Sequence, residues 1–95
     1  MTYHIEGRRW FQRTYGNTYN TVRIFNDGAL IANLPMEYGY GDQWLQRAHD
    51  WLGKNGEPEL AERHSNGSPT VCTTIWLREH DSSYSVNDVS RQRDL

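Results

Sequence analysis

The stretch YGYGDQWLQRAHDW, residues 38–51, decides the fold, because it joins a loop of glycines and tyrosines to an amphipathic segment. Trp44, Ala48 and Trp51 follow one another at i, i+4 and i+7, which places all three on one side of a helix. A helix of about ten residues is marginal in water on its own. We therefore expect both tryptophans to be buried against a second layer of structure.

Two residues mark the ends of this helix. Asp42 is a favourable N-cap, because its carboxylate can accept a hydrogen bond from a free backbone N–H and suits the positive end of the helix dipole. Gly53 supplies the left-handed residue that ends many helices. We predict a helix over residues 43–52.

The chain before the helix carries strand patterns. Residues 3–15 mix aromatic and β-branched side chains with polar ones, which predicts a strand or bent strand. Gly7 suggests a bulge that re-aims the side chains. On strict alternation Trp10 and Phe11 point to opposite faces, and the pattern leaves open which of the two is buried.

A hairpin follows, with strands predicted at residues 19–25 and 29–34. A two-residue loop would divide the apolar side chains between the two faces of the sheet. A three-residue loop at residues 26–28 pairs Ile24 with Leu30 and gathers the apolar side chains on one face. We therefore predict the three-residue loop.

The chain after the helix is more varied. Residues 54–69 are rich in Gly, Pro, Asn and charge and predict a surface loop, with a helical turn at 58–63. Residues 70–79 alternate β-branched and other side chains and predict a strand. A short edge strand is expected near residues 84–86, and a mobile C-terminal tail at residues 90–95.

The order β-β-β-α-β contains no βαβ repeat. It predicts an α+β fold in which a small antiparallel sheet, with room for one more edge strand, packs on one helix. A chain of 95 residues has room for one domain, which we place at residues 1–89. The second face of this sheet would leave Phe25 and Ile31 in water, which favours a homodimer.

Composition argues against several classes of protein. The sequence has neither an apolar run of about 18 residues nor a signal peptide, so we expect a cytoplasmic protein without a membrane partner. The single cysteine, Cys72, excludes an internal disulfide and a multi-cysteine zinc site. The four histidines do not stand at metal-ligand spacings. We expect no enzyme, no metal and no cofactor.

Charge is segregated along the chain. Residues 1–25 contain four arginines and one glutamate, and aromatic side chains lie between the arginines. Arginine neutralises phosphate and aromatic rings stack on unpaired bases, so this pattern suits nucleic acid. The glycine-tyrosine loop before the helix is a second place where a ligand could bind. The candidate binding residues are Arg8, Arg9, Trp10, Arg13, Tyr15, Tyr19, Arg23, Tyr38 and Tyr40.

Residues 26–62 are acidic, with seven carboxylates against two basic side chains. The cluster at residues 57–62, together with Glu37, Asp42 and Asp50, could steer the protein toward a basic site on another protein. Exposed aromatic side chains make good anchors in such an interface. Protein binding is therefore the leading hypothesis for this chain, ahead of nucleic-acid binding.

Three short motifs, RWF at residues 9–11, GNTY at 16–19 and YGYGDQW at 38–44, resemble small uncharacterised proteins encoded by bacteriophages and prophages. The resemblance covers about the first half of the chain and implies no catalytic residue. It implies a small phage protein that acts by binding host factors or nucleic acid.

The expected function is that of a non-enzymatic binding protein, a phage-type accessory protein that binds or inhibits a host protein in the host cell cytoplasm. One alternative is a nucleic-acid-binding protein that uses the basic and aromatic sheet face. The other alternative is a self-assembling structural protein.

Overall fold

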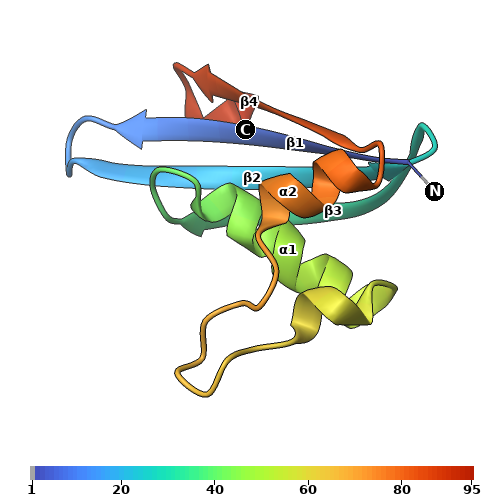
Figure 1. Cartoon of the computed structure of the whole chain (residues 1–95). Coiled ribbons are helices and arrows are strands. Elements are labelled where there is room, and N and C mark those ends of the chain that lie inside the picture. The colour runs from blue at the N-terminus through green and yellow to red at the C-terminus, as the bar shows by residue number, and fades with distance from the viewer. Residues whose placement is uncertain (1) are drawn as a thin grey trace.

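Two helices lie on one face of a four-stranded sheet in the computed structural model, which describes residues 2–95 (Figure 1). Two short 3-10 helices complete the described part of the chain. The strands are β1 (Tyr3–Gln12), β2 (Asn17–Asn26), β3 (Ala29–Tyr38) and β4 (Ser83–Val89). The helices are α1 (Gln43–Asn55), η1 (Pro58–Ala61), α2 (Thr73–Glu79) and η2 (Gln92–Asp94).

The strands stand in the order β3-β2-β1-β4. Neighbouring strands are antiparallel within β1, β2 and β3, whereas β4 runs parallel to β1. The predicted α+β class is confirmed, but the prediction of a purely antiparallel sheet was wrong, because β4 makes the sheet mixed. The helices carry the chain across one face and return it to the β1 edge, so β4 enters the sheet in the direction of β1 (Figure 1).

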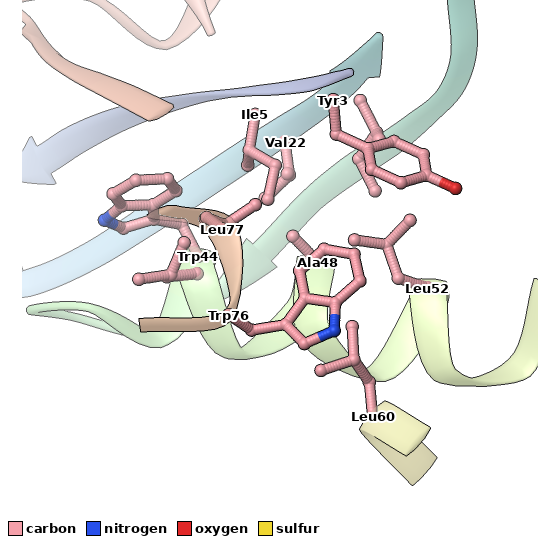
Figure 2. Packing of buried hydrophobic residues seen from close by; sticks show 11 residues of the cluster. Tyr3, Ile5, Val22, Trp44, Ala48, Leu52, Leu60, Trp76 and Leu77 are labelled. Carbon is pink, nitrogen blue, oxygen red and sulfur yellow. The ribbon is translucent and has the colours of Figure 1, made fainter. Parts of the chain in front are cut away.

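The core lies between α1 and the sheet, as the apolar stripe predicted. Trp44 and Ala48 of α1 are at most 1% exposed and pack with Ile5 of β1 and Val22 of β2. Figure 2 shows how Trp76 and other residues of α2 close this cluster from the side. The burial of these side chains supplies the main driving force for folding, because apolar area leaves water.

Gly7 does not form the predicted bulge. Its register is regular on both sides, since it pairs with Val22 of β2 and with Val86 of β4. The indole ring of Trp44 lies directly on its Cα, and a Cβ added at Gly7 would lie 2.5 Å from Trp44 Cδ2. Glycine is therefore present for close approach, not for backbone bending.

Helix α1 begins at Gln43, as predicted, with Asp42 at the N-cap. The Asp42 side chain makes no capping hydrogen bond, and Gly56, not Gly53, ends the helix. Gly53 lies within α1, where an added Cβ would come 2.8 Å from the backbone nitrogen of Ala61. The absence of a side chain at Gly53 lets η1 approach α1 closely. Gly53 therefore serves the packing of α1 and does not end the helix.

The β2–β3 turn has two residues, so the predicted three-residue loop was wrong. Asp27 and Gly28 have φ values of 51° and 86°, and Asn26 pairs directly with Ala29. Positive φ at both central residues is typical of a type I′ turn, which matches the twist of a hairpin.

A β-bulge follows this turn and changes the register. Phe25 pairs with Leu30, and Ile24 pairs with Ala32, so Ile31 is the extra residue. The bulge keeps Ile24 and Ala32 on the buried face. It moves Leu30 to the opposite face, where 52% of its surface is exposed.

The segment predicted as a strand at residues 70–79 contains the helix α2. Trp76 and Leu77 are neighbours in sequence and both are buried, which a helix lying between α1 and the sheet allows. A half-buried strand would expose one of the two. The helical turn predicted within residues 54–69 is confirmed as η1, and the expected edge strand is β4.

Arg47 ties α1 to the sheet. Its guanidinium donates from Nη1 to Asn20 Oδ1 at 2.8 Å and from Nη2 to the carbonyl oxygen of Pro35 at 2.8 Å, and it pairs with Glu37. Burial lowers the pKa of Arg47, while the carboxylate of Glu37 opposes this effect. These contacts hold α1 over the first residues of β2 and the last residues of β3. The pairing of these two strands continues beyond Pro35 to Tyr38.

None of the helices within residues 2–95 has both the length and the apolar character that crossing a membrane requires.

Candidate binding site

The face of the sheet opposite α1 and α2, which we call the open face, carries every second residue of each strand. In β1 and β2 the paired residues on this face are Glu6 with Arg23, Arg8 with Thr21, and Trp10 with Tyr19. The residues between them, such as Ile5 and Val22, point into the core. The basic and aromatic pattern of the sequence therefore gathers on the uncovered face.

Three aromatic rings from adjacent strands form a continuous series on the open face, which we call the aromatic row. Trp10 of β1 and Tyr19 of β2 are stacked, with ring centroids 5.7 Å apart and an interplanar angle of 27°. Tyr19 meets Tyr38 of β3 edge-on at 5.9 Å. Tyr38 is 55% exposed, and the other two rings are half-buried. The row thus presents aromatic surface across three strands.

Two arginines of the open face share one carboxylate. Arg8 Nε lies 3.0 Å from Glu6 Oε1, and Arg23 Nη1 lies 3.4 Å from the same oxygen. Two cations against one anion leave this part of the open face with a positive balance. Each guanidinium has five N–H donors, so neither is saturated by Glu6.

Residues 90–95 lie across the open face on one side of the aromatic row. Arg8 Nη1 donates to the carbonyl oxygen of Asp94 at 3.1 Å, and Gln92 Nε2 lies 3.6 Å from Met36 Sδ in β3. Thr21 stands on β2 between these contacts and is only 7% exposed. The aromatic row therefore runs between this segment and the β1–β2 turn. The mobility of residues 90–95 stays a prediction.

The other predicted site residues lie elsewhere. Arg9 points to the helix side, where it contacts Asp88 at 2.7 Å and donates to the carbonyl oxygen of Gly41 at 3.0 Å. Arg13 and Tyr15 lie in the β1–β2 turn, and Tyr40 lies in the loop before α1 with 73% of its surface exposed. The structure thus places Arg8, Trp10, Tyr19, Arg23 and Tyr38 on the open face. Arg9 and Tyr40 lie outside this face, whereas Arg13 and Tyr15 lie in the turn that adjoins it.

A ligand site around the glycine-tyrosine loop receives no such support. Trp44 is buried under Gly7, and Tyr38 belongs to the open face, so these rings do not line one cavity with Tyr40. The backbone N–H of Gly39 donates to the carbonyl oxygen of Thr18, which fixes the loop against the sheet. The loop serves as the turn from β3 into α1.

Two residues of the open face, His4 and Met36, were not predicted from the sequence. His4 makes a ring contact at 6.2 Å with Phe25, whose place on this face was predicted, at the other end of the sheet from the aromatic row. Met36 was missed because we predicted that the third strand ends at residue 34. Met36 and Tyr38 stand two residues apart, and this strand-like spacing is the signal that could have extended the predicted strand.

The acidic side chains do not form one free surface. Asp50 pairs with Arg63 at 2.7 Å, and Glu57 accepts a hydrogen bond from Tyr3. Glu59 accepts one from the indole of Trp76, and Glu37 pairs with Arg47 as described above. Burial and the contact with Glu57 raise the pKa of Tyr3 to about 12. These carboxylates hold the fold together.

No constellation suited to metal binding occurs in the described part of the chain, where no three His, Cys, Asp or Glu side chains converge. His49 is fully buried and its Nδ1 lies 2.7 Å from Thr73 Oγ1, between α1 and α2. Burial lowers the pKa of His49 and keeps its imidazole neutral. The open face is therefore the strongest candidate for a binding site.

Comparison with known proteins found no matching family model, no similar curated protein and no similar solved structure.

Proposed function

We propose that this chain is a non-enzymatic binding protein that takes single-stranded nucleic acid on the aromatic row. The observation that carries this proposal is the contact of Trp10, Tyr19 and Tyr38 across three neighbouring strands of an uncovered sheet face. Aromatic rings bind unpaired bases by stacking, and this interaction tolerates different sequences because every base has a π face.

An arginine supports the same ligand. Arg8 lies two residues from Trp10 on the open face with guanidinium N–H donors to spare, and it can contact a phosphate while the rings hold the bases. In a duplex the bases are already stacked on one another, so the rings would have no free base face to contact. The row therefore favours single strands over duplexes.

A host-protein partner, which the acidic segment led us to expect first, receives less support. Glu37, Asp50, Glu57 and Glu59 are engaged within the fold, so their charge is not offered as one surface. A phage origin is compatible with the proposed ligand, because single-stranded intermediates accompany phage replication and transcription. The mass measurement described below tests whether the protein forms a homodimer.

The test is a fluorescence-anisotropy titration with single-stranded and double-stranded DNA and RNA at two salt concentrations. The mass of the protein is determined on the same sample. Single strands are expected to bind more tightly, and the affinity should fall as salt increases. Replacing Trp10 or Tyr19 by alanine should weaken binding by about 1–3 kcal/mol, the usual contribution of one stacked base.

Tyr40→Ala is the matched control, because Tyr40 is exposed but lies outside the aromatic row. Its affinity should equal that of the unchanged protein. Equal affinity for duplex and single strand, or equal losses from Trp10→Ala and Tyr40→Ala, would refute the proposal. Absence of binding in all titrations would redirect the search to a protein partner.

A further inference from the structure

A hollow of about 410 Å³ lies at the β1 end of the aromatic row, and we call it the terminal hollow. Trp10 is both the last ring of the row and part of the wall of this hollow. A strand lying on the row from Tyr38 to Trp10 is therefore led directly into it. The hollow is lined by Trp10, Phe11, Gln12, Arg13, Thr14, Val89 and Ser90.

The sheet register explains why the hollow exists. The last pair between β1 and β4 is Trp10 with Val89, whereas β1 continues to Gln12. Beyond Trp10 no strand within residues 2–95 pairs with β1 on this side. The hollow thus occupies the place that two further residues of β4 would fill, and it borders on an unpaired strand edge.

The lining combines apolar walls with polar groups. Trp10 and Val89 offer apolar surface, and Phe11 is 55% exposed. Gln12 Oε1 accepts a hydrogen bond from the Tyr19 hydroxyl at 3.5 Å, and its Nε2 has no hydrogen-bond partner among the described residues. This pairing of flat apolar walls with an unused amide donor suits the face and the polar edge of a base.

Arg13 supplies a cation at the mouth of the hollow. It is exposed, and it makes no ion pair with any residue that the structure describes. Arg8, Arg9 and Arg23 differ in this respect, since each contacts a carboxylate. Arg13 is therefore available for the phosphate of a nucleotide whose base enters the hollow.

We propose that the terminal hollow is a recognition site for one unstacked nucleobase, read on its polar edge by Gln12 and held at its phosphate by Arg13. This inference rests on the proposed function, because the aromatic row must bring the strand to the hollow. It also predicts discrimination between bases, which the aromatic row alone would not provide. Stacking tolerates all bases, whereas an amide at a base edge discriminates between them.

The experiment measures the affinities of four single-stranded homopolymers, oligo(dA), oligo(dC), oligo(dG) and oligo(dT), each of about eight nucleotides. The unchanged protein should distinguish the best from the worst by about threefold to tenfold, the value of one hydrogen bond. Gln12→Ala should bring this ratio close to one. Arg13→Ala should weaken binding to all four homopolymers and leave the ratio unchanged.

A control variant separates the roles. Arg78→Ala removes an exposed cation from α2, on the helix side, and should change nothing.

Equal affinity of the unchanged protein for all four homopolymers, or an unchanged ratio in Gln12→Ala, would overturn the inference while the aromatic row kept its function. An Arg13→Ala variant that binds like Arg78→Ala would also overturn it. Failure of all four homopolymers to bind would overturn the proposed function itself.

Discussion

Replacing Gly7 by alanine should strongly destabilise the fold, although the change adds only one methyl group to a strand. The new Cβ would lie 2.5 Å from both Cδ2 and Cε3 of Trp44 and 3.0 Å from its Cγ. Carbon atoms in contact prefer about 3.5–4.0 Å, so the ring or the strand must retreat by about 1 Å. Trp44 is 1% exposed and packs between β1 and α1, which leaves the ring little room to move.

The magnitude follows from two opposing effects. Overpacking a core costs about 1–3 kcal/mol, and a clash against a confined indole belongs at the upper end. Loss of glycine's freedom in the unfolded chain offsets about 0.5–1 kcal/mol. The free energy of unfolding of Gly7→Ala should therefore fall by about 2 kcal/mol, which lowers Tm by about 8–16 °C in a domain of this size.

The assay is urea and thermal unfolding followed by far-UV circular dichroism, within a double-mutant cycle. Trp44→Phe shortens the ring that the new methyl meets. Gly7→Ala should therefore cost at least about 1 kcal/mol less in the Trp44→Phe background. Additive effects, or a loss below about 0.5 kcal/mol for Gly7→Ala alone, would refute the reasoning that the glycine serves close packing.

Three further outcomes are expected. Burial lowers the pKa of His49 in the folded protein, so the unfolded chain binds a proton at this histidine first as the pH falls. The free energy of unfolding should be at its full value above about pH 6.5 and should decline as the pH falls below it. Unfolding measured across that pH range should lose this dependence in His49→Gln. Asp42→Ala should change the free energy of unfolding in urea by less than about 0.5 kcal/mol, because the carboxylate makes no capping bond; a loss of about 1 kcal/mol would show that it caps the helix in solution. Deletion of residues 91–95, which spares Ser90 of the terminal hollow, should leave Tm nearly unchanged, because the contacts of this segment with Arg8 and Met36 are exposed, and should strengthen oligonucleotide binding in the anisotropy titration; weaker binding would show that the segment belongs to the site.

Local patterns predicted the parts of the fold that depend on neighbouring residues. The stripe of Trp44 and Ala48 fixed α1 and its buried side, because helical spacing and burial agree there. Alternation placed Trp10 and Phe11 on opposite faces but left open which of them is buried, so the contact of Trp10 with Tyr19 at the centre of the candidate site was not predicted. The third ring, Tyr38, could be named but not placed.

The errors arose where two periods fit the same residues or where the partner is distant in sequence. The segment containing Trp76 and Leu77 satisfies the period of a strand as well as that of a short helix, and only its place between α1 and the sheet decides. The bulge at Ile31 and the parallel pairing of β4 depend on strands that the local pattern does not contain. The contacts of Arg47 could not be predicted for the same reason, since its partners lie on the sheet.

The parallel pairing of β1 with β4 also affects the order in which the molecule can form. His4 and Ser83 touch although they stand 79 positions apart in the chain, whereas the two hairpins need only local contacts. Closing so long a loop is entropically costly and slow. During synthesis the first three strands and α1 are made before β4, so one long edge of β1 stays unpaired. Until β4 arrives, that edge is a surface on which two nascent chains can join, and its protection by chaperones would govern the yield of folded protein.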